Sequence, residues 1–421
     1  MISIKRVKKQ TGITLIALVI TIVILIILAA VAINAAFGDN GLIQQAEKAR
    51  EYQLNADSAD STLLNSATEY IEGIIDGNGN SGGSGETPTI PSTVEEAKES
   101  EFVFTEKTTI EDEHGNKITI PGGFKVPEES GDTVQEGIVI EDISASTDEN
   151  VQGSQFVWIP VGKFIKDDGS ESNEIILGRY TFNTTDGTST LIQNATNYTE
   201  DVKIDSLYTE FPTYQEGIIS DESDGKNSTA KDLKGFIDSV NANGGYYIGR
   251  YEASYASGNG VENYKAASKI TTEYSTDNMS YKASTLWNYI TQIDASQVSI
   301  NTYLDSTTVK SDLMNSYAWD TAIVYIQEAG NNNYANRAGN SISSNLANTG
   351  TIGDEVCKIN DMSSNVWEWT TENSSYNANN SLYPCIGRGG NFYSNGFTAR
   401  RGSNLSSTKG NNVGFRFYIY M

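Results

Sequence analysis

An uncharged apolar run, ITLIALVITIVILIILAAVAI, occupies residues 13–33. At about 1.5 Å per residue, a helix of this length crosses the ~30 Å hydrocarbon core of a membrane. Four basic residues precede the run in MISIKRVKKQTG, and such a flank stays on the cytoplasmic side, which places the rest of the chain outside. A signal peptide is the alternative, but its apolar region is usually shorter, about 7–15 residues. The pattern therefore predicts a transmembrane helix over residues 13–34.

The next two segments differ sharply in their polar pattern. Residues 35–76 place apolar side chains on stripes at helical spacing, which predicts a helical extension. Residues 77–100 are rich in Gly and Ser and contain two prolines, which is typical of a flexible linker.

From residue 101 onward, short β-branched and aromatic runs such as KITI and QFVWIPV predict strands separated by turns. DEHGNKITIPGGFKV predicts a hairpin, and three segments predict helices: STAKDLKGFIDSVNAN, YKASTLWNYITQ and NSYAWDTAIVYIQEAG. The stretch 173–227 is rich in Asn, Thr, Ser and Asp and predicts a loop insertion. We expect an irregular α+β domain over residues 101–421.

Composition narrows the function. The net charge of -25 and the pI of about 4.4 exclude a nucleic-acid partner, because phosphate binding needs a basic surface. The one histidine, His114, lies in the polar turn EDEHGNK, where a solvated turn residue is expected. Abundant Gly, Ser, Asn and Tyr are typical of an extracellular β-rich protein.

The N-terminus, KKQTGITLIALVITIVILIILAAVAINAAFGDNG, resembles that of type IV prepilins. The resemblance implies cleavage by a prepilin peptidase between Gly12 and Ile13, after a basic leader over residues 1–12, and partnership with pilin-type subunits. The family usually has Glu at the fifth mature position, where this chain has Ala17. That departure weakens the case for assembly into a main filament, and the Ala variant resembles pilin-like proteins of Gram-positive bacteria. The resemblance implies a bacterial cell-surface location.

Six further blocks occur in one order over residues 156–421: FVWIPVGKF, YYIGRYEAS, AWDTAIVYI, DMSSNVWEWTTE, GRGGNF and NNVGFRFYI. Together they resemble the formylglycine-generating-enzyme-like, or sulfatase-modifying-factor, domain. The resemblance implies a variant of the C-type lectin fold.

Several residues of these blocks suit a structural role. Paired glycines allow a close backbone approach, an arginine forks onto a carboxylate or carbonyls, and GFRFYIY alternates as a half-buried strand. The two tryptophans of NVWEW are expected as core anchors, with ligand stacking as the alternative. The structural candidates are Trp367, Trp369, Arg388, Gly389, Gly390, Gly414, Phe415 and Arg416.

In the family, calcium binds near the NVWEW motif, and the resemblance implies Asn365 and Glu368 as its ligands. Calcium prefers several hard oxygen ligands at about 2.3–2.6 Å. The alternative is an internal clasp between Glu368 and Arg388, Arg400 or Arg416.

The oxidising members of the family use a copper-binding C-x4-C pair after their GGSW-like block. The equivalent stretch, GGNFYSNGFTARRGSN, contains no cysteine, and Ser394 stands where the first would fall. A hydroxyl does not replace a thiolate as a soft-metal ligand, so we expect no copper and no such enzyme activity. The chain's two cysteines, Cys357 and Cys385, lie before these motifs, and a disulfide between them is one expectation in an extracellular setting.

Residues 391–412 combine Asn, Ser, Tyr and Gly, the residues favoured in adaptable recognition loops. The segment resembles the variable tail of lectin-fold receptors diversified by retroelements; an ordinary polar loop is the alternative. Its candidate ligand-binding residues are Asn391, Tyr393, Asn395, Phe397, Arg400, Asn404 and Ser406.

The resulting hypothesis is a membrane-anchored, pilin-like surface protein whose non-catalytic lectin-fold head binds an extracellular glycan or protein, as an adhesin or minor pilin. An anchored enzyme of the sulfatase-modifying type and a structural pseudopilin without ligand are the alternatives.

Overall fold

The computed structural model describes residues 89–195, 203–204, 208–209, 232–275, 282–374, 385–394 and 396–421. The predicted leader, transmembrane helix and helical extension lie outside these residues. By its internal contacts the chain divides into two units, Met1–Thr87 and Pro88–Met421. In the described part, no helix combines the length and apolar character needed to cross a membrane.

We call the second unit, Pro88–Met421, the head. Its main sheet has six antiparallel strands in the order β15-β22-β10-β5-β4-β3. Its strands are β3 (Phe124–Lys125), β4 (Val139–Asp142), β5 (Gln155–Pro160), β10 (Gly245–Gly249), β15 (Lys310–Leu313) and β22 (Phe417–Tyr420). The central strands β5, β10 and β22 are buried along their whole length, which explains their nearly continuous apolar sequences.

Three longer helices accompany this sheet: α4 (Leu233–Asn243), α5 (Gln292–Thr302) and α6 (Ser316–Glu328). The side chain of Asn315 accepts a hydrogen bond from the backbone N–H of Ala318 and so caps α6, while Gly244, with a φ of 75°, ends α4. The predictions of α4 and α6 are confirmed.

The helix predicted over YKASTLWNYITQ is wrong, because that segment contains the short strand β14 (Thr285–Leu286) and α5 begins only at Gln292. Ser284 and Tyr289 adopt positive φ values of 67° and 59°, which a right-handed helix excludes. Thr291 then caps α5 by accepting from the N–H of Asp294.

A second sheet has the order β20-β19-β18-β9-β8, and β21 pairs in parallel with β18. Its strands are β8 (Lys203–Ile204), β9 (Tyr208–Thr209), β18 (Trp367–Ser374), β19 (Cys385–Arg388), β20 (Arg401–Asn404) and β21 (Val413–Phe415). Most of the candidate site residues belong to this sheet or to the loops beside it.

The remaining elements are short. They are α3 (Val94–Glu99), β1 (Thr108–Glu111), β2 (Lys117–Ile120), β6 (Gly178–Phe182), β7 (Ser189–Asn194), β11 (Ser254–Ser257), β12 (Lys265–Ala267), β13 (Glu273–Tyr274), β16 (Glu355–Val356), β17 (Ile359–Asn360) and the 3-10 turns η2 (Tyr334–Asn336) and η3 (Gly339–Ser341). The β1–β2 pair is the hairpin predicted around His114.

Two of these elements correct the sequence predictions. Helix α3 lies inside the predicted linker 77–100, because Thr93 caps it and Val94 and Ala97 are buried. The β6–β7 hairpin lies inside the predicted loop insertion 173–227, where buried Arg179 and Tyr180 attach it to the head.

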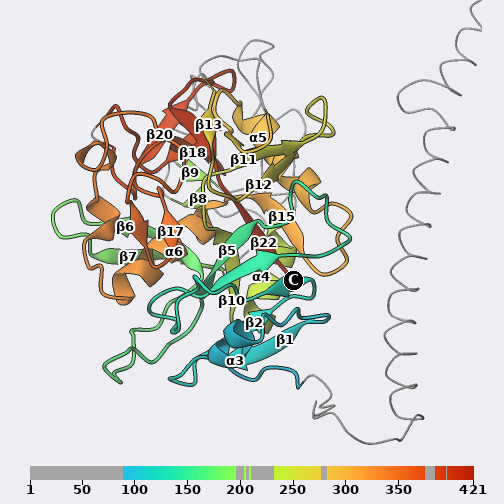
Figure 1. Ribbon diagram of the computed structural model, residues 1–421. Coiled ribbons are helices and arrows are strands. Elements are labelled where there is room, and N and C mark those ends of the chain that lie inside the picture. Colours follow the sequence, from blue (N-terminus) through green and yellow to red (C-terminus); the bar gives the residue numbers. More distant parts are fainter. Residues whose placement is uncertain are drawn as a thin grey trace, which may run out of the picture. The chain divides into compact units, whose positions relative to one another are not determined.

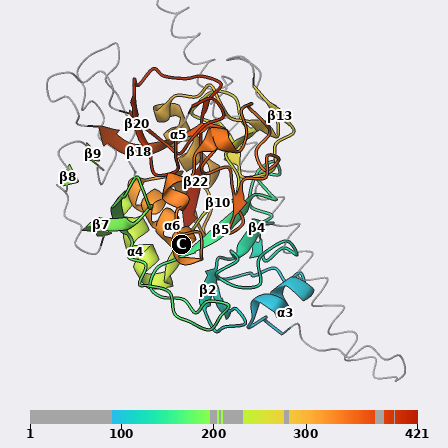
Figure 2. The ribbon, with the colours of Figure 1, turned by 90° about the vertical axis from the view of Figure 1, so that its left-hand side faces the viewer.

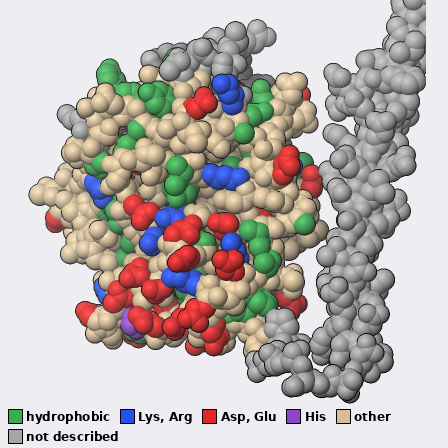
Figure 3. Space-filling view, in the orientation of Figure 1, with side chains coloured by type: hydrophobic (Ala, Val, Ile, Leu, Met, Phe, Trp, Pro, Cys, Tyr) green, Lys and Arg blue, Asp and Glu red, His purple; other side chains and the backbone are tan. Residues whose placement is uncertain are grey.

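Strands β18 and β20 lie at one end of the head, and α3 and β2 at the other (Figures 1 and 2). The described part of the chain begins beside α3. In Figure 3, acidic side chains gather on the lower part of the face shown.

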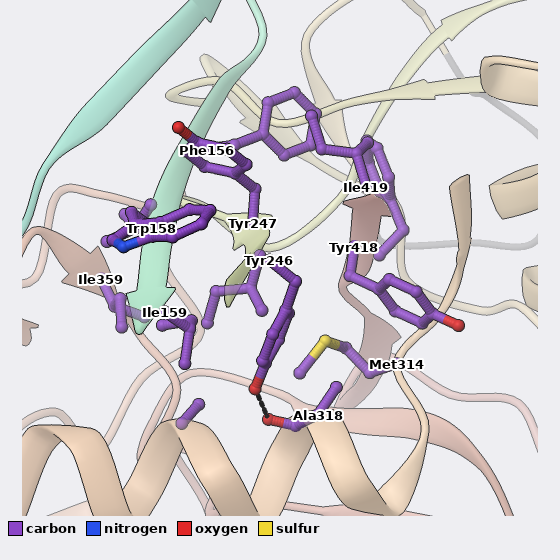
Figure 4. Packing of buried hydrophobic residues seen from close by; sticks show 14 of the residues in the cluster. Phe156, Trp158, Ile159, Tyr246, Tyr247, Met314, Ala318, Ile359, Tyr418 and Ile419 are labelled. Carbon is purple, nitrogen blue, oxygen red and sulfur yellow. Dashed lines mark hydrogen bonds between the residues drawn. The ribbon is translucent and has the colours of Figure 1, made fainter. Parts of the chain in front are cut away.

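The core lies between the main sheet and α6 (Figure 4). The Tyr246 hydroxyl, from β10, donates a 2.7 Å hydrogen bond to the carbonyl oxygen of Ala318 on α6. Neighbouring rings are in contact, as for Trp158 and Tyr247, whose centroids are 5.0 Å apart. The head is thus an irregular α+β domain with an aromatic core.

Candidate functional site

The two tryptophans of β18 differ in environment. Trp369 is fully buried and its indole N–H donates to the carbonyl oxygen of Ile290 at 2.8 Å, as expected of a core anchor. Trp367 is only partly buried, and the guanidinium of Arg400 lies over its ring, 4.8 Å from the centroid. The Trp367 ring therefore supports a cation from the predicted recognition segment.

Glu368 forms the internal clasp with Arg416. Its Oε1 accepts from Nη2 of Arg416 at 2.7 Å and its Oε2 from Nε at 3.1 Å. The other hydrogen bonds of Arg416 go to the carbonyl oxygens of Gly249 and Asn360, both at 2.7 Å. Burial raises the pKa of Glu368, and Arg416 opposes this shift.

The side chain of Asn365 is also engaged. Its Nδ2 donates to Oε2 of Glu252 at 2.6 Å, and its Oδ1 accepts from the N–H of Ala347 at 3.0 Å. Burial, and then the neighbouring Asp361 and Glu368, raise the pKa of Glu252 well above its usual value.

These two side chains do not fit a calcium ion as they stand, because an ion would have to displace Arg416 from Glu368. Within the described ranges, no three His, Cys, Asp or Glu side chains are grouped so that they could hold a metal.

Arg388 binds two carboxylates that the motifs did not single out. Its Nη2 lies 2.5 Å from Oδ1 of Asp320, and its Nη1 lies 3.1 Å from Oε2 of Glu372. Its Nε donates to the carbonyl oxygen of Arg400. The guanidinium of Arg388 thus binds carboxylates and a carbonyl oxygen as predicted. These contacts connect β19 to α6, to β18 and to the segment before β20.

Gly389 and Gly390 follow at a close backbone crossing. Gly389 has a φ of 77°, and a Cβ on Gly390 would lie 2.3 Å from the carbonyl oxygen of Ser363. A Cβ on Gly414 would lie 2.9 Å from a methyl carbon of Val366. The next residue, Phe415, is buried against Trp287 with ring centroids 5.9 Å apart. These positions agree with their predicted structural roles.

The predicted recognition segment begins at a buried turn organised by Asn391. Its Oδ1 accepts from the backbone N–H of Tyr393, and from the N–H and hydroxyl of Ser394, at 3.1, 2.7 and 2.9 Å. The side chain of Tyr393 is 75% exposed. The turn therefore holds an aromatic side chain in solvent.

The other candidates of this segment are half-buried: Phe397, Arg400, Asn404 and Ser406. Asn404 donates to the carbonyl oxygen of Gly402 within β20. Asn395 lies outside the described residues. Among the described candidates of this segment, Tyr393 is the most exposed.

The cysteines are thiols in the structure, so the predicted disulfide is wrong. Cys357 lies in the turn between β16 and β17, whereas Cys385 begins β19 in a different sheet. Burial raises the pKa of Cys357 to about 12 and also raises that of Cys385, so neither thiol is activated.

Sequence reasoning missed the partners of these arginines, Asp320 and Glu372. Asp320 interrupts the apolar stripe of AWDTAIVYI, whereas Glu372 stands among the polar residues that follow NVWEW. A charged residue within an apolar helical stripe was therefore the sequence signal that could have pointed to Asp320.

Residues 306–420, which hold most of these side chains, match the family of the sulfatase-modifying factor enzyme 1-like domain. The C-terminal region of the chain is thus an FGE-sulfatase-type domain, which confirms that part of the resemblance. The match spans the last four of the six sequence blocks.

Among solved structures, the crystal structure of CarF is similar with 13% sequence identity, covering 51% of this chain and 97% of that chain, at a TM-score of 0.29. No curated protein matches the chain.

Proposed function

We propose that the FGE-sulfatase-type domain is a non-catalytic, ligand-binding head displayed at a bacterial cell surface. The observation that carries this proposal lies in the recognition segment 391–412, where a buried Asn391 turn presents Tyr393 to solvent. Tyrosine supplies a large amphipathic contact area at low entropic cost.

The segment lies at one end of the head. It contains β20, which lies at the end of the head opposite α3 (Figures 1 and 2). The apolar run 13–33, which lies outside the described residues, would supply the membrane anchor and contacts to pilin-type subunits.

Buried ion pairs form the scaffold under the segment, which suits recognition. Arg388, just before the segment, and Arg401, within it at the start of β20, are bound to Asp320 and Glu372 in the interior. Such a base lets side chains at the surface vary without loss of the fold, as in other loop-based binding sites.

The test is to screen the purified full-length chain on glycan arrays and on arrays of cell-surface proteins. The proposal expects saturable binding to a restricted set of ligands. Absence of binding to either array would favour the structural pseudopilin.

An anchored enzyme is the second candidate, favoured by the family match itself. The segment has Ser394 rather than a cysteine at the first expected copper position, and its hydroxyl donates to Asn391. The full chain incubated with copper and a cysteine-containing peptide should give no aldehyde beyond copper alone. Catalytic turnover would establish the enzyme instead.

A further inference from the structure

Arg400, in the recognition segment 391–412, is the one arginine of the described residues that pairs with no carboxylate. The others form ion pairs: Arg179, Arg250, Arg337, Arg388, Arg401 and Arg416. Within the same described ranges, the half-buried Arg400 side chain also donates no hydrogen bond. Because a guanidinium does not lose its proton in a protein, Arg400 carries a charge that no carboxylate of these residues neutralises directly.

An aromatic ring rather than an acid holds the guanidinium of Arg400 in place. The group lies over Trp367, 4.8 Å from the ring centroid. Gly396 packs against both, because a Cβ on it would lie 3.2 Å from Nε1 of Trp367 and 3.3 Å from Nη1 of Arg400. Contact with a ring uses the face of a guanidinium, whereas its N–H donors lie in its plane. The donors of Arg400 therefore stay available to a further acceptor.

The charge of the recognition segment is opposite to that of the chain. The chain has 54 Asp and Glu against 29 Lys and Arg, yet its last acidic residue is Glu372. The segment thus contains no carboxylate, and its charged residues are Arg400, Arg401 and Lys409. Figures 1 and 3 share one orientation, in which acidic side chains gather on the lower part of the face and β20 lies in the upper part. A locally positive surface on an acidic protein favours an anionic ligand.

The other exposed groups of the segment suit a sugar better than a protein. Among its described residues, Tyr393 is the only exposed large apolar side chain. Its remaining exposed residues are Ser403, Ser407, Lys409 and Asn411. The centre of a protein interface is usually apolar, which these residues do not supply. Hydroxyl and amide groups both donate and accept hydrogen bonds, as the hydroxyls of a sugar require.

We propose that the recognition segment binds a glycan that carries a carboxylate, as a uronic or sialic acid does, and that Arg400 binds this carboxylate. The two oxygens of a carboxylate match the parallel N–H donors of a guanidinium, so one contact supplies both charge and direction. This inference rests on the proposed binding function and names the chemical class of the ligand.

The test prints uronic-acid and sialic-acid glycans on the array, each beside its methyl ester, which keeps the sugar ring and loses the charge. The Kd of the full-length chain in detergent is then measured for each acid and ester that binds. The acid should bind at least about tenfold more tightly than its ester, because hydrogen bonds to charged groups are the strong ones. Added sodium chloride should reduce this preference, since it screens an accessible ion pair.

Variants at Arg400 separate a carboxylate contact from a structural role. Arg400→Gln should bind the acid and the ester equally, and the ester as tightly as the wild type does. Arg400→Lys, which keeps the charge without the fork, should retain part of the preference. The control is Lys310→Gln, which removes a cation on β15 that lies over Tyr420 and pairs with Asp232. This control should keep the wild-type preference.

Several outcomes would overturn this inference and leave the binding function standing. They are binding only to neutral glycans or only to proteins, an unchanged preference for the acid in Arg400→Gln, and equal losses of acid and ester binding in that variant. Absence of binding to any ligand would overturn both proposals. If Arg400→Gln does not fold, Arg400→Lys and the comparison of acid with ester in the wild type decide.

Discussion

At the scale of single residues, Arg416 joins three parts of the head through one guanidinium group. It binds Glu368 on β18, the carbonyl oxygen of Gly249 on β10 and that of Asn360 on β17. Since all these groups are buried, the arginine satisfies acceptors from both sheets at once.

This arrangement makes a prediction about metal removal. Because the Glu368 carboxylate is occupied by Arg416, EDTA should leave the Tm of the full chain unchanged, and added calcium should not restore or raise it. Differential scanning calorimetry with and without EDTA measures this, with magnesium as the control ion. A lower Tm in EDTA that calcium alone reverses would show that the family's calcium site is retained.

A second residue-scale prediction concerns Glu372. Burial alone would raise its pKa, but Arg401, Arg179 and Arg388 together hold it at about 2, against an ordinary value of 4.5. A depressed carboxyl pKa contributes stability that is complete above the ordinary value and is lost as the pH falls toward the folded value.

Glu372→Gln should therefore lower the free energy of unfolding at pH 7 by about 3–5 kcal/mol, because it leaves buried arginines uncompensated. The gap to the wild type should narrow as the pH falls below about 4.5. Urea unfolding at a series of pH values measures both effects. Glu355→Gln, at a partly exposed ion pair with Arg250, is the matched control and should have a small effect. A gap that is the same at every pH would refute the role assigned to Glu372.

At the scale of elements, the connection after β19 depends on backbone contact. A Cβ on Gly390 would meet two carbonyl oxygens, of Ser363 at 2.3 Å and of Gly396 at 2.7 Å. Neither is the end of a flexible side chain, so the backbone itself would have to move.

Gly390→Ala should consequently lower the free energy of unfolding by about 1–3 kcal/mol or more. Gly387→Ala, three residues earlier in β19, is the control, because its Cβ would meet no atom closer than 3.5 Å. It should change stability by less than about 0.5 kcal/mol. Equal losses of unfolding free energy for the two substitutions in chemical denaturation would show that the backbone around Gly390 can accommodate a Cβ.

The elements also show what could be predicted from sequence. Helix α6 was visible because its apolar spacing is regular and Asn315 caps it. The helix predicted before α5 was wrong because Ser284 and Tyr289 adopt positive φ values, which are unusual for serine and tyrosine and cannot be predicted from the residue types. In such cases tertiary contacts override local propensity.

The site was predictable to a similar degree. Close approach at Gly390 and the clasp alternative for Glu368 followed from residue chemistry and family resemblance. The cluster of Arg179, Asp320 and Arg401 did not, since its members are far apart in sequence and only the fold brings them together. The cysteine pairing failed for the same reason, because the strand neighbours of Cys385 were not known.

At the scale of the whole molecule, buried arginine clusters tie together the interior of residues 88–421, whose C-terminal part, residues 306–420, matches the FGE-sulfatase family. The candidate recognition segment lies on the far end from α3 (Figures 1 and 2). The proposed role as a displayed binding head places function in that segment rather than in the interior.

The most direct test compares binding of three full-length proteins to the ligands that the arrays return: the wild type, Tyr393→Ala and Tyr274→Ala. Both tyrosines are exposed, Tyr393 at 75% and Tyr274 at 41%, but only Tyr393 lies in the recognition segment. Loss of a contact aromatic should weaken binding by about 1–2 kcal/mol or more, roughly a tenfold or larger rise in Kd, in Tyr393→Ala alone. Unchanged affinity in Tyr393→Ala, or an equal loss in Tyr274→Ala, would contradict the account.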